Sequence, residues 1–493
     1  MKFIKQKQFL IILFVLVTCF PIFLHLGAIP VRMYDEARLA INAYEMSESG
    51  NCIVTTFENE PDMWNTKPPL MIWLQVLFIK WIGIGELAIR LPSAIAAFLT
   101  CILLFWFSAK YLRSYLIGLF AVVVLVSSQG YIDVHVVRTG DYDSLLVLFT
   151  TFSSLIFFIF LEYNKKTKYL YLFTAGIILG VLTKGIAGLL LMPVYFIYLL
   201  VRKDAIKLFK NKHLYFNVLI FILIVSGYYV LREYYNPGYI QAVVKNELFS
   251  RYFETIEGHK HESWFYFKQL KDWQFTPWVY IFPLGLASGF LSKDKLIKKF
   301  AGYSFLLVII YFIIISFGQT KLVWYAIPTF PFLALSVALV ISGIRNLIGI
   351  LFLRFNDFYK SLVAFIIVVL FSFAPYNKII QKVLKPKEYS WDAEFYETGY
   401  YLKSAVKNDI PLNGYILIHN GYYAHNLFYV NILHDKGNDI QITHDFKNII
   451  SGKYIVHQAE VKEYIENNYN YVLIDEIKNI RFYKITESNE NGN

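Results

Sequence analysis

The sequence has few cysteines and few charged residues. Only three cysteines occur among 493 residues, and their positions offer no disulfide framework. Charged residues make up 17% of the chain, against about 25% in an ordinary soluble domain, while hydrophobic residues make up 57% and aromatic ones 18%. Internal repeats and low-complexity tracts are also lacking. These values exclude a disordered chain and argue against a purely soluble protein.

Apolar runs of about 20 residues, long enough to cross a bilayer, recur through the first 375 residues. They predict a polytopic α-helical membrane protein with about eleven spans. The first run follows a short basic flank, is long for a signal peptide and lacks a small-x-small cleavage site, so we interpret it as a retained helix rather than a cleaved signal. The other ten spans are expected at about residues 91–109, 115–130, 144–161, 169–182, 186–200, 214–231, 277–291, 300–317, 322–343 and 361–375.

The formal net charge of +11 reflects orientation rather than nucleic-acid binding, because Lys and Arg mark cytoplasmic loops of membrane proteins. With a cytoplasmic N-terminus, every short loop on the inside has a Lys or Arg excess, and the acidic segment 29–68 lies outside. Residues 70–85 are interpreted as an amphipathic helix on the outer membrane face. The alternative, a short transmembrane helix, would invert every later loop.

The composition changes after Pro375. Residues 385–493 are polar and contain the strand-like runs GYILIHN, KYIVH and NYVLID, with helix-like stretches such as AEVKEYIENN between them. This alternation predicts a small α/β domain, which the odd number of spans places outside the cell. We therefore expect a transmembrane domain over 1–380, with outer loops at 29–90 and 232–275, and an extracytoplasmic α/β domain over 385–493.

Charged and imidazole side chains gather at the predicted outer ends of the spans. Polar groups near membrane depth are costly and usually face a cavity or a partner. The residues are Asp35, Glu36, Arg38, Lys67, Arg138, Asp141, Asp143, Lys184, His259, His261 and Lys321.

Asp35 and Arg38 share a helix face, because they are three residues apart. They could form a local ion pair. Alternatively, Asp35 could act as a general base while Arg38 binds an anion, because a guanidinium binds phosphate through two parallel hydrogen bonds. Lys67 precedes two prolines and could reach lipid headgroups or hold a ligand phosphate.

Asp141 and Asp143 lie at the N-terminal end of one predicted helix. One of them could be the helix N-cap, and the other would then be available for a catalytic or binding role. Lys184 and Lys321 lie in polar turns between apolar spans, where Lys321 could be a topological anchor. His259 and His261 allow a metal site, although structural zinc needs three or four ligands.

The ordered set of motifs resembles the GT-C glycosyltransferases of the protein O-mannosyltransferase-like superfamily, most of all the bacterial branch that includes the lipid A aminoarabinose transferase. The matching stretches, spread over about residues 1–340, are YDEAR from Tyr34, KPPL from Lys67 with Trp73, ELAIRLPS from Glu86, Arg138 to Leu146, LTKG from Leu182, WFYF from Trp264 before Pro277-Trp278, and Lys321 to Pro331.

The resemblance implies an inverting transfer of a sugar from a polyprenyl-phosphate donor to a lipid, glycan or protein acceptor on the outer face of a bacterial plasma membrane. It implies that Asp35 is the catalytic-site aspartate and that Asp143, or else Asp141, is the acidic residue at the start of the next helix; we add Glu36 to these catalytic candidates. It implies phosphate binding by Arg38 and Lys67, and we add Arg138, Lys184 and Lys321 to this group.

One departure from the family pattern concerns a metal. The lipid A branch often places Glu before the Lys-Pro, where it can help bind a metal, but this chain has Thr66. This departure weakens the case for a metal and for aminoarabinose as the transferred sugar. We expect no required cofactor and a divalent metal as a possibility. A polytopic lipid or glycan transporter, or an assembly subunit with ion-paired charges, remains an alternative; a transporter would move its substrate without cleaving it.

Overall fold

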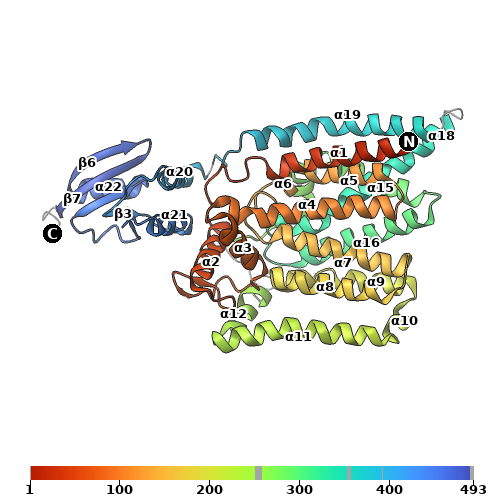
Figure 1. The fold of residues 1–493 in the computed structure, drawn as a ribbon, viewed down its shortest axis with the longest axis horizontal. Coiled ribbons are helices and arrows are strands. Elements are labelled where there is room, and N and C mark those ends of the chain that lie inside the picture. Colours follow the sequence, from red (N-terminus) through yellow and green to blue (C-terminus); the bar gives the residue numbers. More distant parts are fainter. Residues whose placement is uncertain (1, 250–257, 352–356, 391, 489–493) are drawn as a thin grey trace.

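A computed structural model describes residues 2–249, 258–351, 357–390 and 392–488 of the chain. This part of the chain forms an elongated bundle of helices with a small sheet-containing unit at one end (Figure 1). The elements from α1 to α19 form the bundle, and those from α20 to β7 form the end unit. The predicted fold class, a polytopic helical protein with a small α/β unit after it, is confirmed.

Seven described helical segments are long and apolar enough to cross a membrane. They are α4 (Glu86–Lys110), α7 (Asp143–Glu162), α8 with η1 (Thr167–Lys184, Gly185–Leu189), α11 (Lys212–Tyr235), α16 (Lys295–Phe317), η4 with α17 and α18 (Val323–Thr329, Phe330–Ala338, Val340–Leu351) and α19 (Asp357–Leu384). Five shorter apolar helices accompany them: α1 (Lys2–Phe23), α3 (Leu70–Ile82), α5 (Tyr115–Ser127), α9 (Met192–Arg202) and α15 (Trp278–Phe290). With α3 set aside, eleven apolar segments remain among the described residues, at the places of the eleven predicted spans.

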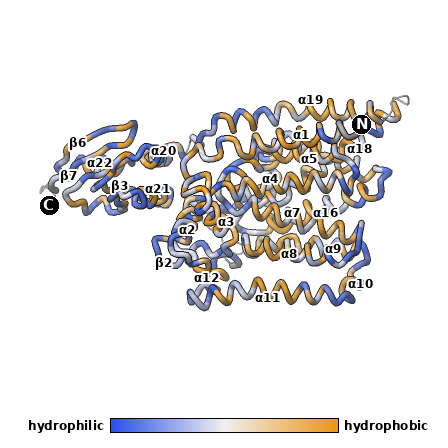
Figure 2. The backbone as a smooth tube through the Cα atoms, viewed as in Figure 1, coloured by the Kyte–Doolittle hydropathy of each residue, from blue (hydrophilic) through white to orange (hydrophobic). Residues whose placement is uncertain are grey.

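Apolar residues predominate along these helices, whereas the end unit is more mixed (Figure 2). The helix α3 lies beside α2 at the end of the bundle that carries this unit (Figure 1). One face of α3, with Met71 and Gln75, is buried, whereas Leu77 and Trp81 are exposed. One-sided burial of an apolar helix at the end of the bundle is the arrangement expected of an interfacial helix.

The helix α2 (Asp35–Ser49) starts with two carboxylates, which the positive N-terminal end of a helix dipole favours. It ends at Gly50, whose φ of 70° is the left-handed conformation that glycine adopts without strain. A short hairpin of β1 (Thr56–Phe57) and β2 (Glu60–Pro61) follows and turns the chain back along α2. This local structure places the start of α2 and the residue after β2 in one region.

Short helices connect the long ones. They are α6 (Gln129–Ile132), α10 (Ala205–Phe209), α12 (Tyr239–Val243), η2 (Val244–Phe249), α14 (Phe265–Gln269) and η3 (Leu270–Gln274). The predicted outer loop 232–275 is thus largely helical where the structure describes it.

The end unit contains a five-stranded sheet in the order β4-β3-β5-β7-β6. Its elements are α20 (Ala393–Asn408), β3 (Tyr415–Ile418), α21 (Ala424–Asp435), β4 (Gln441–Thr443), β5 (Gly452–Val456), α22 (Ala459–Asn468), β6 (Tyr469–Ile477) and β7 (Ile480–Ser488). The strands β4, β3 and β5 are parallel, and β7 runs antiparallel to both of its neighbours. All three strand-like runs of the sequence are strands, and the helix-like run AEVKEYIENN is α22.

The end unit is attached to the bundle through polar contacts with its outermost segments. The hydroxyl of Tyr429 on α21 donates to Glu86 at 2.5 Å and accepts from the backbone N–H of Val31 at 2.8 Å. The hydroxyl of Tyr44 on α2 donates to Asp435 at 2.8 Å. These contacts fix α21 against α2, next to the site described below.

Candidate active site

The carboxylate of Asp35 lies at the N-terminal end of α2, and its side chain is 57% exposed. The ring of His135, from the loop between α6 and α7, lies 3.7 Å from Asp35 and 3.5 Å from Asp141 through its Nδ1 atom. His135 also stacks on Trp324, with ring centroids 3.6 Å apart. An exposed carboxylate and a buried one therefore face the same imidazole.

Their ligand atoms all lie within 4.8 Å of one another, and within the described ranges this is the one group of three that meets this distance as the side chains stand. The Oδ2 atom of Asp141 is buried and lacks a hydrogen-bond donor. Burial, with Asp35 and Glu36 nearby, raises the pKa of Asp141 well above its usual value. Burial also lowers the pKa of His135 to about 4, so the imidazole is neutral at pH 7 and its contact with Asp141 is not an ion pair.

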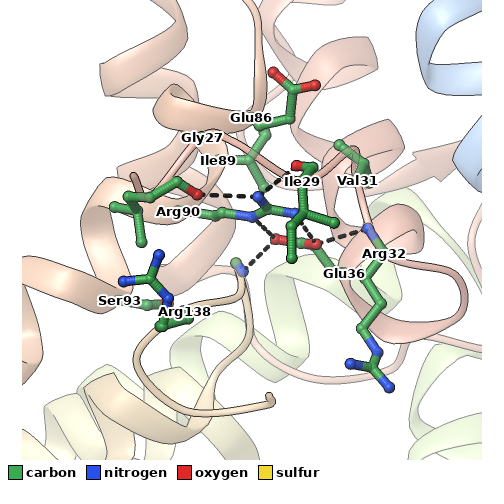
Figure 3. A network of polar contacts seen from close by, with 12 residues as sticks. Gly27, Ile29, Val31, Arg32, Glu36, Glu86, Ile89, Arg90, Ser93 and Arg138 are labelled. Atoms are coloured by element: carbon green, nitrogen blue, oxygen red, sulfur yellow. Dashed lines mark hydrogen bonds and ion pairs between the residues drawn. The ribbon is translucent and has the colours of Figure 1, made fainter. Parts of the chain in front are cut away.

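Glu36 is 1% exposed and lies in a buried ion pair with Arg90 of α4 (Figure 3). Arg90 donates to both carboxylate oxygens, at 2.7 and 2.8 Å, and its other N–H groups bind backbone carbonyls of residues 26–30. Glu36 also accepts from the backbone N–H groups of Arg32 and Gly140. Burial alone would raise the pKa of Glu36, but Arg90 outweighs it and holds the pKa below its usual value. Glu36 thus ties α2 to the loop that carries Asp141.

Arg38 forms a bidentate pair with Asp62, at 2.8 and 2.7 Å, rather than an ion pair with Asp35. Asp62 follows β2, is buried, and also accepts from Asn42 and from the backbone N–H groups of Trp64 and Asn65. Burial would raise the pKa of Asp62, but the hydrogen bonds from Arg38 keep it below its usual value. The guanidinium is therefore held in a fixed orientation near the start of α2.

Lys67 precedes Pro68 and Pro69, which end the loop before α3. Its Nζ atom lies 3.3 Å from Glu247 and 5.6 Å from the ring centre of Tyr142. Glu247 belongs to η2, in the segment after α11 and α12. The lysine thus joins the loop before α3 to a segment about 180 residues away.

Asp143 and Lys184 form a buried ion pair between α7 and α8, with both N–O distances at 2.7 Å. Neither Asp141 nor Asp143 caps α7, whose N-cap residue is Tyr142. A cavity of about 650 Å³ lies beside the pair, lined by Asp143, Lys184 and Glu247 together with apolar residues of α7, η1 and α16. Charged groups at one part of an apolar cavity suit a ligand with a charged head and a hydrocarbon tail.

The remaining predicted residues lie at the edges of this region or away from it. Lys321 is buried after α16 and donates to the carbonyl of Gly318 at 2.8 Å, next to Thr320, which lines the cavity. Arg138 is not among the residues that line this cavity. It donates to three carbonyls at the end of α1 and lines a second cavity of about 590 Å³. His261 stacks on Phe265, and neither His259 nor His261 belongs to the group of potential metal ligands found in the described chain.

Tyr422, from the end unit, covers the start of α2. Its ring stacks on Tyr34 with centroids 5.2 Å apart, and its hydroxyl donates to the carbonyl of Tyr34 at 3.1 Å. Burial raises the pKa of Tyr422, and Arg38 opposes that rise, so the guanidinium and the phenol are close neighbours. The end unit thus contributes a side chain to the surroundings of Asp35 and Arg38.

Sequence reasoning missed five residues of this region: Asp62, Arg90, His135, Glu247 and Tyr422. Two carried a signal, because Asp62 belongs to the acidic outer segment and Arg90 to the ELAIRLPS motif. His135 and Tyr422 lie in loops and Glu247 in the short helix η2, and no sequence motif marks these three residues.

A sequence model of the family described as dolichyl-phosphate-mannose-protein mannosyltransferase matches residues 66–229, which include Lys67, Asp143 and Lys184. Among curated proteins, the chain is 26% identical over 340 residues to an uncharacterized protein of Aquifex aeolicus. It is also 26% identical over 350 residues to the undecaprenyl phosphate-alpha-4-amino-4-deoxy-L-arabinose arabinosyl transferase 1 of Proteus mirabilis. These matches cover 68% and 69% of this chain but only 64% and 60% of the relatives.

Solved structures show the same fold. The crystal structure of ArnT from Cupriavidus metallidurans bound to undecaprenyl phosphate superimposes with a TM-score of 0.72 at 16% identity, covering 96% of this chain and 97% of that one. The oligosaccharyltransferase AglB from Archaeoglobus fulgidus, in complex with an inhibitory peptide and a dolichol-phosphate, gives 0.52 at 12% identity, covering 87% and 64%. The chain is therefore an integral membrane protein of the GT-C glycosyltransferase fold, similar to the lipid A aminoarabinose transferases.

Proposed function

We propose that this protein is an inverting glycosyltransferase that moves a sugar from a polyprenyl-phosphate donor to an acceptor on the outer face of the membrane. The observation that carries the proposal is the cavity of about 650 Å³ beside Lys184, with Lys67 next to its wall at Glu247. Apolar side chains such as Leu146 and Ile315 line the rest of it. Such a cavity matches the two chemical halves of a polyprenyl phosphate.

The charged groups suit the two demands of an inverting displacement at a sugar carbon. A base must activate the acceptor from the face opposite the leaving group, and Asp35 is the exposed carboxylate of the site. The leaving phosphate needs no general acid, because fixed cations can stabilise its charge. Lys67 and Lys184 are held in place by Glu247 and Asp143, so they are oriented before the donor binds.

The orientation follows from the basic end of the bundle. The helix α10 lies at the end opposite α2 and α3 (Figure 1). Lys165 pairs with Asp204 just before α10, and Lys299 in the first turns of α16 pairs with Glu162. Because Lys and Arg mark cytoplasmic loops, we place this end in the cytoplasm and the α2 end, with the C-terminal unit, outside.

The proposal extends to the kind of sugar transferred and the kind of acceptor. The relative from Proteus mirabilis is named as an arabinosyl transferase, which favours a pentose over a hexose as the transferred sugar. The acceptor is a lipid, a glycan or a protein exposed at the outer membrane face.

Replacing Lys67 by Ala is expected to weaken binding of undecaprenyl phosphate by about 30-fold or more. Removing one partner of a desolvated charge pair costs on the order of 2 kcal/mol or more, which corresponds to that factor. The measurement is a titration of the purified protein in detergent with undecaprenyl phosphate, followed by intrinsic fluorescence or calorimetry.

The matched control is Lys80→Ala, which removes an exposed lysine of the neighbouring helix α3. It should bind the lipid as the wild type does. Equal affinity of wild type, Lys67→Ala and Lys80→Ala, with all three folded, would remove Lys67 from the donor site. Release of free sugar from a labelled polyprenyl-phosphate sugar then separates an enzyme from a transporter, which would leave the bond intact.

We also expect a divalent cation to bind between Asp35, His135 and Asp141, because Asp141 presents a buried oxygen without a donor and His135 is neutral. When bound, the ion would supply a Lewis acid and a fixed positive charge at the start of α2. Since the ion competes with the proton on Asp141, whose pKa is raised, Mn²⁺ affinity should rise with pH. Manganese binding followed by electron paramagnetic resonance should fall at least tenfold in Asp141→Asn and stay unchanged in His261→Gln. Binding that is equal in both variants, or independent of pH, would contradict this site.

A further inference from the structure

Each of the three parallel strands of the C-terminal sheet is followed directly by a histidine. His444 comes after β4, His419 after β3 and His457 after β5. The strand register pairs Ile418 with both Thr443 and Val456, so the three histidines stand in one row at the carboxyl edge of the sheet. Open α/β sheets bind ligands at this edge.

A fourth histidine approaches the row from the helix that follows β3. His425 lies in the first turn of α21, and its ring centroid is 5.2 Å from that of His419. The ring of His457 is stacked on that of His419 at the same centroid distance. The side chains of His419, His425 and His457 are all buried, with exposed fractions of 1%, 3% and 0%.

The protein leaves the buried ring nitrogens of His425 and His457 unsatisfied, whereas Nδ1 of His419 lies 3.1 Å from the side-chain amide nitrogen of Asn426. Both ring nitrogens of His425 and both of His457 lack a hydrogen-bond partner. An unsatisfied buried polar atom costs about 1–3 kcal/mol, and most native structures avoid it.

We propose that His419, His425 and His457 bind a divalent transition-metal ion of the Zn²⁺ class in the C-terminal unit. Three imidazoles form an established donor set for Zn²⁺, whereas Ca²⁺ and Mg²⁺ require oxygen ligands. As the side chains stand, their ring nitrogens do not all lie within 4.8 Å of one another, so binding requires the rings to turn about their side-chain torsions and direct one nitrogen each at the ion. This turn satisfies nitrogens that otherwise stay unpaired. This site is separate from the Asp35 region and does not depend on the proposed sugar transfer.

The position of the site gives it a structural consequence. His419 and His425 bracket the segment 420–424, which carries Tyr422 to Tyr34 at the start of α2. An ion bound by both histidines fixes the two ends of this segment relative to each other. Metal binding therefore orders the loop that covers the start of α2.

The test uses the full-length protein in detergent, stripped with a chelator and titrated with Co²⁺ and Zn²⁺. The cluster variant is His419→Gln/His457→Gln, and the matched control is His259→Gln/His261→Gln. We expect the wild type and the control to bind one more equivalent of metal than the cluster variant, with the visible absorption of four-coordinate Co²⁺. Zn²⁺ should raise the thermal midpoint of the wild type and the control by more than that of the cluster variant, which keeps the Asp35 region.

The single variant His425→Asn replaces the double one if the latter does not fold, and it should lose the same equivalent. Equal metal uptake by wild type and folded cluster variants would overturn the proposal. So would a wild type that takes up no ion with the four-coordinate spectrum.

Discussion

Asp35→Asn is expected to lower the rate of sugar transfer by about two to four orders of magnitude, the usual contribution of a general base. The asparagine keeps the shape of the side chain and its place at the start of α2, but it cannot accept a proton from an acceptor hydroxyl. Binding of undecaprenyl phosphate should change little, because Lys67 and Lys184 are untouched. The measurement is the initial rate of transfer from a labelled polyprenyl-phosphate sugar, together with lipid titration of the same preparation.

The matched control is Glu48→Gln, an exposed carboxylate near the other end of α2, which should transfer at the wild-type rate. A rate above a tenth of wild type in Asp35→Asn would contradict the role as a base. That outcome would indicate an acceptor that is itself a phosphate, which needs no strong base, and would leave Asp35 to position substrates.

Glu36→Gln should destabilise the protein by about 3 to 5 kcal/mol, because it leaves the buried charge of Arg90 without a counterion. Transfer should fall as well, since Glu36 joins α2 to Gly140, next to Asp141. Glu36 is in this sense a positioning residue. The expected result is a lower midpoint of thermal unfolding in detergent.

The double variant Glu36→Leu/Arg90→Met tests whether the unpaired charge of Arg90 causes the loss of stability. A buried ion pair can often be replaced by apolar residues at little cost, so the double variant should unfold at a higher temperature than Glu36→Gln. It should still transfer poorly, because the bond to Gly140 is lost. The exposed Glu60→Gln serves as the control with unchanged stability. A Glu36→Gln protein as stable as wild type would show that the pair contributes nothing.

The elements of the fold were largely predictable because their causes are local. Apolar runs of bilayer length identify membrane spans from the sequence alone. The short apolar runs within residues 385–493 correspond to the strands β3, β5 and β6. The helical content of the outer loop 232–275 was not predicted, because α12 and α14 are only five residues long and carry little periodicity.

The site was predictable in its residue types but not in its pairings. The sequence places Arg38 three residues from Asp35, yet the guanidinium binds Asp62, which the β1–β2 hairpin returns to α2. The partner of Glu36 lies 54 residues away on α4. Such pairs depend on how helices pack against one another, and packing partners do not occur at a fixed spacing in the sequence.

The helix α11 differs from the other long helices in how it is held. Only 6% of its most apolar 18-residue stretch is buried, against 89% for the same length of α7. The helix lies along one side of the bundle (Figure 1). Near one end the buried side chain of Arg232 donates to the carbonyl of Ile53 at 2.9 Å, and near the other end the ring of His213 lies 3.0 Å from the hydroxyl of Tyr171. A displacement of α11 therefore breaks less packing than the same displacement of α7. The segment that carries Glu247 follows α11 in the chain, so the contact between Glu247 and Lys67 is the part of the site most directly coupled to this helix.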